Sequence, residues 1–138
     1  MQTFLQYPNH DLSHQSMVSA GMVVSVPALY GTVRHYGISS NPGFVIDKSF
    51  MLGKVAERPM QDFLNGNDLR LEGHWGVLDP LFVLQNARER IGEPWTLRRN
   101  CEHFVRECHG LKSESPQLSR AVSSVLIGAV LLQSRSSR

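Results

Sequence analysis

Two β-rich runs on either side of a turn constrain the fold of this chain more than any other feature. Residues 33–39 and 44–50 are rich in β-branched and aromatic side chains, and Asn-Pro-Gly at 41–43 separates them. This arrangement predicts an antiparallel β-hairpin. A third β-rich run, residues 21–26, ends at Pro27 and is expected to lie beside the hairpin. The sequence therefore predicts a three-stranded antiparallel unit.

The apolar face of the hairpin sets its register. A turn centred near residue 41 pairs Tyr36 with Ile46 on that face. The same register places His35 opposite Asp47 on the other face, where opposed Cβ atoms lie about 4.5–5.5 Å apart. At that distance a carboxylate can orient an imidazole and favour its charged form. A strand His beside an Asp is also a common surface pair, so the hairpin alone does not define a catalytic site.

A second segment, residues 100–111, predicts a short amphipathic helix that begins at a cysteine. Apolar residues recur with helical spacing from Cys101 to Cys108, and Gly110 marks the end. Asn100 is the expected N-cap, which leaves Cys101 in the first turn at the positive end of the helix dipole. A thiol in that place ionises more easily, and the thiolate attacks carbonyl groups. Most cysteines on apolar helix faces are inert core residues, so nucleophile and core residue remain alternatives from this segment alone.

Further short motifs accompany these two segments. Ile-Gly at 91–92 and Trp-Thr-Leu at 95–97 precede the run Asn-Cys-Glu-His-Phe-Val at 100–105, with the His35 strand far upstream. Together these motifs resemble the lecithin:retinol acyltransferase-like family, whose members are also called H-box/NC proteins. The resemblance covers residues 21–112, and its most specific part is the run that contains the cysteine.

The resemblance implies both a fold and a set of roles. The implied fold is α+β, with a small antiparallel sheet packed against the catalytic Cys helix in a circularly permuted papain-like arrangement that is related to NlpC-type peptidases. The implied catalytic residues are Cys101 as nucleophile, His35 as base and Asp47 at the third polar position.

Two positions depart from the family pattern. Asp47 stands where many animal members carry a second His, and Val33 stands where an aromatic residue is common. Val33 therefore removes one expected contributor to the oxyanion hole, whereas the amide of Cys101 remains a suitable donor. His103 follows the cysteine by two residues, which points it away from the thiol on a helix. We expect His103 to cap or pack rather than to catalyse.

The function that these expectations imply is a thiol-dependent acyltransferase or phospholipase. It would act on glycerophospholipid ester bonds through a Cys thioester, with phospholipid or another acyl compound as substrate and without a cofactor. Two alternatives stay open: a cysteine amidase or peptidase of the NlpC type, and a non-catalytic H-box/NC interaction module.

Length and charge indicate one domain. The chain has 138 residues of which 41% are hydrophobic, enough for a single core. We expect an N-terminal extension over residues 1–20, the catalytic domain over 21–112, and an apolar helix with a basic tail over 113–138. The net charge of +2 gives no support for nucleic-acid binding. The N-terminus lacks the pattern of a signal peptide, and we expect a cytoplasmic protein.

The cysteines and histidines indicate neither a disulfide nor a metal site. Cys101 and Cys108 lie two helical turns apart, about 10 Å, which is too far for them to bridge each other. A reducing compartment also suits a reactive thiol. His10 and His14 have helical spacing, but no third ligand is close in the sequence.

The apolar segment at residues 121–132 leaves two alternatives. It lies between Arg120 and Arg135, and as a helix it would span about 20 Å against a hydrocarbon core of about 30 Å. It could associate with a membrane by partial insertion, with the arginines at the interface, or dock on the core of the protein itself. The resemblance favours the membrane, because several family members carry an apolar C-terminal tether.

One further helix is predicted before the Cys helix. Asp79 and Pro80 form a strong helix start, and Gly92 a stop. The expected buried stripe of this helix is Leu81, Leu84, Ala87 and Ile91. Between residues 50 and 76 the only additional element predicted is a strand near 69–71.

Overall fold

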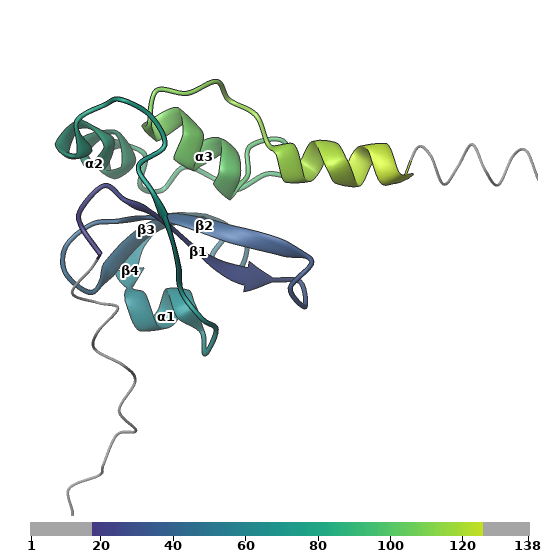
Figure 1. Cartoon of the computed structure of the whole chain (residues 1–138), viewed down its shortest axis with the longest axis horizontal. Coiled ribbons are helices and arrows are strands. Elements are labelled where there is room, and N and C mark those ends of the chain that lie inside the picture. The colour runs from purple at the N-terminus through teal and green to yellow at the C-terminus, as the bar shows by residue number, and fades with distance from the viewer. Residues whose placement is uncertain (1–17, 126–138) are drawn as a thin grey trace, which may run out of the picture.

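The computed structural model describes residues 18–125, which form a sheet with helices on both of its faces (Figure 1). The sheet is antiparallel, and its five strands lie in the order β4-β3-β2-β1-β5. The strand bounds are β1 Val23–Ala28, β2 Val33–Ser39, β3 Phe44–Ser49, β4 Lys54–Pro59 and β5 Arg70–Gly73. The predicted α+β class and the small antiparallel sheet are therefore confirmed.

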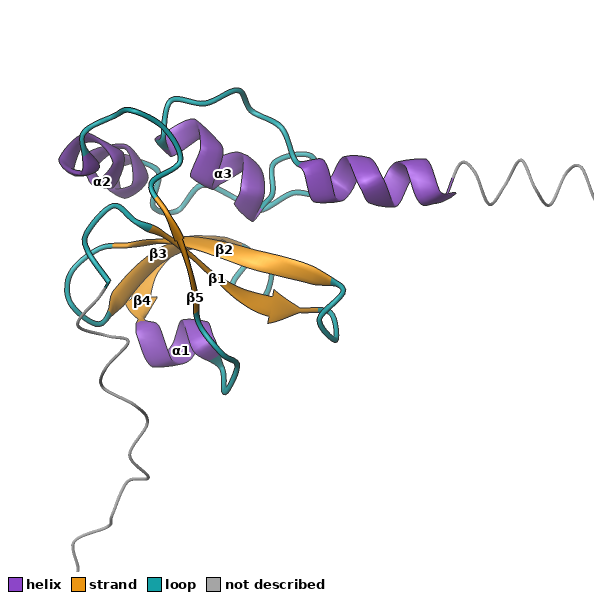
Figure 2. Cartoon of the chain, in the orientation of Figure 1, coloured by secondary structure: helices purple, strands orange, loops and turns teal. Residues whose placement is uncertain are grey.

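Three helices with complete bounds and one further helix accompany the sheet. The three are α1 Met60–Leu64, α2 Pro80–Glu89 and α3 Cys101–Cys108. Figure 2 shows α2 and α3 on one side of the sheet and α1 on the other. Residues 116–125 are also helical and project from the domain (Figure 1). Most of the predicted N-terminal extension, and residues 126–132 of the apolar segment, lie outside the described residues.

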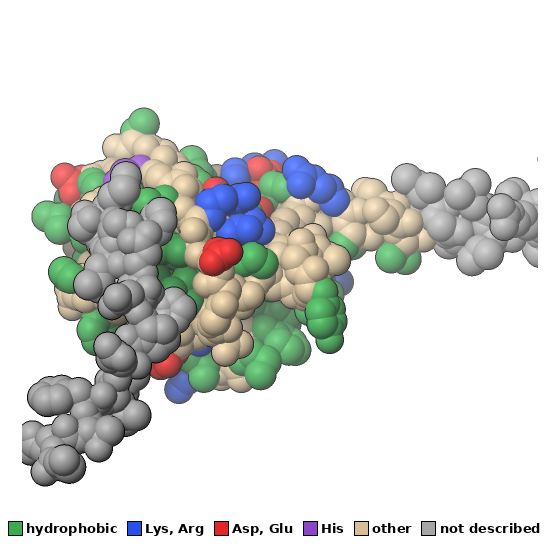
Figure 3. Space-filling model, turned by 60° about the horizontal axis from the view of Figure 1, so that its bottom comes forward, with side chains coloured by type: hydrophobic (Ala, Val, Ile, Leu, Met, Phe, Trp, Pro, Cys, Tyr) green, Lys and Arg blue, Asp and Glu red, His purple; other side chains and the backbone are tan. Residues whose placement is uncertain are grey.

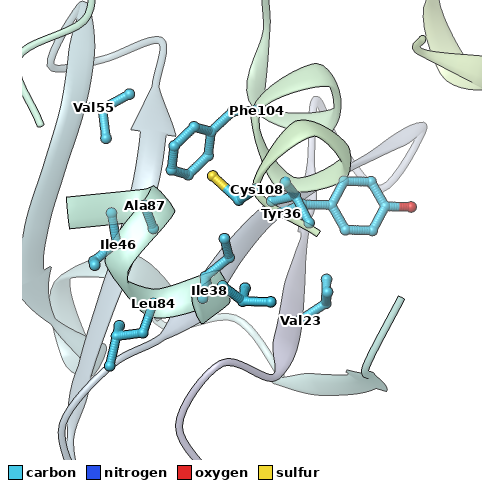
Figure 4. Packing of buried hydrophobic residues seen from close by; sticks show 11 residues of the cluster. Val23, Tyr36, Ile38, Ile46, Val55, Leu84, Ala87, Phe104 and Cys108 are labelled. Carbon is cyan, nitrogen blue, oxygen red and sulfur yellow. The ribbon is translucent and has the colours of Figure 1, made fainter. Parts of the chain in front are cut away.

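Each face of the sheet carries its own core cluster. The cluster under α2 and α3 is mainly aliphatic and also includes Phe104 and Cys108, which reach it from α3 (Figure 4). Tyr36 belongs to the same cluster, but its hydroxyl points away from the aliphatic side chains (Figure 4). The smaller cluster on the other face contains Val45 from the sheet and Phe63 from α1. A sheet with two covered faces gives the residues of β2 and β3 fixed positions on either side.

The β2–β3 hairpin forms at the predicted residues but in a register shifted by two. Asp47 pairs with Gly37, rather than with His35 as predicted. The cause is the turn, because the Ser40 amide donates to the Phe44 carbonyl at 3.0 Å, which centres the loop one residue later than expected. A shift of two residues leaves every side chain on its predicted face, since side chains alternate with a period of two. His35 and Asp47 therefore still share a face.

The helix α2 begins at the predicted residue but buries a different stripe. Leu84 and Ala87 are buried as expected, whereas Leu81 and Ile91 are 71% and 48% exposed. Val83 is fully buried in place of Leu81. Ile91 is exposed because the helix ends at Glu89, before the predicted stop, so Ile91 lies in the following turn.

The fold also contains elements that the sequence does not predict. Strand β4 and helix α1 lie between residues 50 and 76, and β1 continues through Pro27 instead of ending there. The predicted strand near 69–71 is confirmed as β5.

A buried lysine anchors the segment that leads into α3. Lys48 of β3 has no exposed surface, and its ammonium donates to Glu93 at 2.7 Å. Arg90 also donates to Glu93, at 2.7 Å. The hydrogen bond from Arg90, followed by that from Lys48, outweighs burial and lowers the pKa of Glu93 to about 2. Glu93 is therefore a carboxylate at neutral pH and ties the chain before α3 to the sheet.

The C-terminal helix differs from the others in its exposure. Its residues 121–125, the described part of the apolar segment, are all exposed, with Val122 at 50% and Val125 at 72%. Within residues 18–125, no helix has the length and apolar character that crossing a membrane requires.

Candidate active site

The N-terminus of α3 holds Cys101 in place. The Asn100 side chain accepts hydrogen bonds from the amides of Glu102 and His103, at 3.0 and 3.3 Å. The His103 ring returns a bond by accepting from the Asn100 amide at 3.3 Å, which completes a capping box. Both predictions are confirmed: Asn100 is the N-cap and His103 a capping residue. Cys101 therefore stands in the first turn of the helix, partly exposed.

His35 and Asp47 meet on one face of the sheet. The Nε2 atom of His35 lies 2.6 Å from Oδ2 of Asp47, and the Asp47 side chain has no exposed surface. In the observed register the two residues are diagonal rather than directly opposed, and a His side chain is long enough to cover that separation. The predicted contact therefore forms although the predicted pairing does not.

Arg58 of β4 is a member of this group that the sequence did not reveal. Its Nε and Nη2 atoms donate to the two carboxylate oxygens of Asp47 at 2.8 and 2.7 Å. This two-pronged geometry is the strongest form of an Arg–carboxylate pair. The guanidinium also lies over the Phe63 ring, 5.8 Å from its centre, and the His35 ring is 5.4 Å from the same phenyl group. Arg58 and Phe63 thus fix Asp47 and His35 in position.

The pKa of His35 reflects both Asp47 and the neighbouring thiol of Cys101. Burial alone would lower the pKa of His35, but hydrogen bonds with Asp47 and with Cys101, and the negative charge of both groups, raise it to about 9. Because Asp47 occupies Nε2, the nitrogen left for the thiol is Nδ1. The imidazole therefore has a carboxylate on one side and a sulfur on the other, and it holds a proton at neutral pH.

The strand pairing explains how a thiol from α3 meets a histidine of the opposite face. The β2–β3 ladder extends from Ser39 only as far as Gly37 and Asp47. Beyond that point His35 pairs with β1 alone, and β3 continues only with β4. The two halves of the sheet separate at His35, so Cys101, which packs against the α2/α3 cluster, can reach the imidazole.

Gly37 gives the site its close packing. A Cβ atom added there would lie 2.5 Å from Cγ1 of Val45, 3.1 Å from the Phe63 ring and 3.3 Å from Cβ of Asp47. Val45 is fully buried and has little room to move. Only a residue without a side chain lets Phe63 approach the strand closely enough to support His35.

The chain after α3 links the cysteine helix to the histidine strand. Ser115 donates to the buried Glu102 carboxylate at 2.6 Å. The Gln117 side-chain amide accepts from the Arg34 amide at 2.7 Å and donates to the Arg34 carbonyl at 3.0 Å. These residues are neighbours of Cys101 and His35 in the sequence. We call Glu102, Ser115, Gln117 and the Arg34 backbone the clasp, because together they hold the two catalytic candidates side by side.

The second cysteine provides an internal contrast. Cys108 is 1% exposed and lies in the core, and burial raises the pKa of its thiol to about 12 despite the nearby Arg90 guanidinium. Both cysteines are free. The same helix therefore carries one accessible thiol beside a histidine and one inert thiol.

An open groove is lined by the clasp residues Glu102 and Gln117, and neither His35 nor Cys101 is part of its lining. It has a volume of about 770 Å³, and its lining includes Arg34 and Tyr36, which flank His35, and Glu102, which follows Cys101. Trp75 forms another wall and packs edge-on against Tyr36, with 5.1 Å between ring centres. The groove offers both apolar rings and arginine side chains to a ligand.

The described residues contain no candidate metal site. Within 18–125, no three His, Cys, Asp or Glu side chains are grouped so that they could hold a metal ion. His10 and His14, the pair considered from the sequence, lie outside the described residues.

No protein-family model matches the chain, and no curated protein matches it. The resemblance to the lecithin:retinol acyltransferase-like family therefore stays a prediction, and the functional argument depends on the geometry of the site.

Proposed function

We propose that this protein is a thiol-dependent acyltransferase or phospholipase that attacks the ester bonds of glycerophospholipids and carries the acyl group on Cys101 as a thioester. One observation carries the proposal: a buried series of contacts runs from Arg58 through Asp47 to His35 and ends at an accessible thiol. A nucleophile, a base beside it and a group that orients the base are the parts that covalent catalysis requires.

The first step forms the thioester. The imidazolium of His35 keeps Cys101 as a thiolate, and the sulfur attacks the ester carbonyl carbon. The contact with Asp47 stabilises this imidazolium, in agreement with the raised pKa of His35. When the tetrahedral intermediate collapses, the C–O bond breaks and His35 returns its proton to the departing alkoxide. The products of this step are an acyl-Cys101 and a lysophospholipid.

The backbone of α3 supplies a donor for the oxyanion. The amides of Glu102 and His103 donate to the Asn100 side chain, and the amide of Phe104 donates to the Asn100 carbonyl. Of the four first-turn amides, that of Cys101 remains for the substrate. A fixed amide at the positive end of a helix is well suited to the charge that develops on the carbonyl oxygen.

The second step releases the acyl group. Water, an alcohol or an amine attacks the thioester carbonyl while the now neutral His35 takes its proton, and Cys101 leaves as a thiolate beside the imidazolium that results. With water the reaction is that of a phospholipase, and with an amine or alcohol that of a transferase. Both reactions use the same residues in the same positions.

Two further observations agree with this proposal. The groove lined by the clasp combines Trp75 and Tyr36 with Arg34 and Arg106, a composition that suits acyl chains together with a phosphate. The order of the catalytic candidates, His on β2 before Cys on α3, agrees with the permuted papain-like arrangement that the family resemblance implies. We include in the proposal a cytoplasmic protein that associates with membranes through residues 121–132.

The test is incubation with fluorescent phosphatidylcholine followed by intact-protein mass measurement. We expect an acyl adduct on the wild-type protein, none on Cys101→Ala, and an undiminished adduct on the control Cys108→Ala. No adduct on the wild type, or an adduct that persists in Cys101→Ala, would contradict the proposal. Cleavage of peptide amides that depends on Cys101, without reaction on lipid, would instead favour an amidase or peptidase.

A further inference from the structure

Two loops that are distant in the sequence meet beside the N-terminus of α3. The turn at 50–53 joins β3 to β4, and the loop at 94–99 leads into the cysteine helix. The Trp95 amide donates to the Gly53 carbonyl at 2.8 Å, and the rings of Phe50 and Trp95 pack edge-on with 4.9 Å between centres. The two loops therefore form one continuous surface.

This surface is apolar and exposed. We call it the loop patch, and it consists of Phe50, Met51, Leu52, Lys54, Leu97 and Arg98. The exposed fractions of its apolar residues are 67% for Phe50, 87% for Met51, 48% for Leu52 and 61% for Leu97. A contiguous group of this kind marks an interaction surface more often than scattered single residues do.

Exposure alone does not single out the loop patch. Hydrophobic side chains reach the surface at several places on the face drawn in Figure 3. Val77, Leu81 and Phe82 form another exposed group, around the N-terminus of α2, and Asp79 lies among them. What distinguishes the loop patch is its charge and its position.

The charge of the loop patch is entirely positive. Neither of its two segments contains an Asp or a Glu. Lys54 and Arg98 are exposed, and neither forms an ion pair with a residue of the described chain, whereas the neighbouring Arg99 pairs with Glu107 at 3.1 Å. Exposed aromatic and aliphatic side chains next to Lys and Arg side chains are typical of protein surfaces that bind the interface of an anionic bilayer.

The position of the loop patch places it next to the nucleophile. The loop at 94–99 ends at Asn100, whose side-chain amide donates to the Leu97 carbonyl at 3.4 Å, and Cys101 follows directly. We propose that the loop patch docks on the surface of an anionic phospholipid bilayer and thereby presents Cys101 to the ester bonds there. This inference rests on the proposed function for its choice of a lipid partner, and it names the membrane surface as the place where that function operates.

The test measures partition of the full chain onto vesicles of phosphatidylcholine mixed with phosphatidylserine. We expect Met51→Asp and Leu97→Asp each to lower the partition coefficient about tenfold or more, because each replaces an apolar side chain that becomes buried in the lipid when the protein binds. Lys54→Gln combined with Arg98→Gln should weaken binding to mixed vesicles and leave binding to pure phosphatidylcholine unchanged. The matched control is Val77→Asp, an equally exposed apolar residue outside the loop patch, which should partition as the wild type does.

Several outcomes would overturn the inference. Unchanged partition of Met51→Asp and Leu97→Asp would show that another part of the chain, such as residues 121–132, makes the lipid contact. A wild-type dimer in sedimentation that Met51→Asp dissociates would show that a second copy covers the loop patch. Thermal denaturation of each variant shows whether it is folded, and we expect no change because the substituted residues are exposed.

The same experiment separates this inference from the proposed function. If the wild type forms no acyl adduct on vesicles but the loop-patch variants still lose binding, the docking surface stands and the proposed function is wrong. If the adduct forms and the loop-patch variants bind and react as the wild type does, the docking inference is wrong and the proposed function stands. Cys101→Ala should bind vesicles like the wild type in either case.

Discussion

Replacing Arg58 by Gln removes both guanidinium bonds from a carboxylate that has no exposed surface. Breaking a buried ion pair from one side costs about 3–5 kcal/mol, because the remaining charge stays buried. Asp47 keeps His35 as a partner, and the Arg58 side chain is 19% exposed, so water can enter the vacated space. We therefore expect a cost of about 3 kcal/mol, near the lower end of that range. For a domain of this size the melting temperature should fall by about 10–20 °C.

The assay is a double-mutant cycle by urea denaturation with Arg58→Gln, Asp47→Asn and the double variant. The coupling energy should be about 2 kcal/mol, because the two side chains contact each other directly. Arg70→Gln is the matched control: Arg70 also pairs with a carboxylate, that of Glu72, but its side chain is 55% exposed, so its loss should cost less than about 1 kcal/mol. If Arg58→Gln costs no more than the control, or if the coupling is below about 0.5 kcal/mol, the pair of Arg58 and Asp47 does not stabilise the site as described.

Four further predictions concern the same site. In Asp47→Asn the pKa of His35 should fall from about 9, because the hydrogen bond and the charge of Asp47 are lost while burial still lowers it, and NMR titration of the ring measures this. Because the pKa of His35 is raised in the folded state, His35 stabilises the fold below pH 6.5, and this stabilisation is lost as the pH rises towards 9. Over that pH range the free energy of unfolding of the wild type should fall relative to that of Asp47→Asn, as measured by denaturation. Gly37→Ala should cost about 1–3 kcal/mol by thermal denaturation, through its clash with Val45; an unchanged melting temperature would contradict the packing described. Asn100→Ala should cost about 1 kcal/mol and Asn100→Asp much less, because Asp keeps the cap; equal losses in urea denaturation would count against the capping role.

The sequence predicted which face each hairpin residue occupies but not the register. Alternation of apolar and polar residues has a period of two, so it separates registers that differ by one residue and is blind to those that differ by two. The geometry of the turn decides between the latter, and the hydrogen bond from Ser40 to Phe44 places the turn one residue further along. The contact between His35 and Asp47 was predicted correctly because it depends on the face.

Arg58 was missed because its strand has little pattern. Strand β4 lies at the edge of the sheet and reads Lys-Val-Ala-Glu-Arg-Pro, with only Val55 fully buried. A strand with one neighbour needs few apolar residues, so periodicity does not reveal it. The two-pronged contact with Asp47 also depends on the pairing of β3 with β4, which is a feature of the tertiary structure and not of the local sequence.

The helix that carries Cys101 shows the opposite case. Its cap, its first turn and its buried face were all predicted, because these depend on residues close together in the sequence. The clasp was not predictable in this way. Gln117 contacts the backbone of Arg34 across most of the chain, and nothing in the local sequence of either residue indicates that contact. The loop patch likewise requires two loops that only the fold brings together.

If Cys101, His35 and Asp47 work as one reactive unit, the rate of thiol alkylation reports it. Iodoacetamide is added to the folded protein near neutral pH, and peptide mass measurement follows Cys101 and the buried Cys108 separately. We expect Cys101 to be modified at least about a hundredfold faster than Cys108, and Asp47→Asn to slow Cys101 alone. Equal rates for the two cysteines, or a Cys101 rate that is unchanged in Asp47→Asn, would show that the three side chains do not act together.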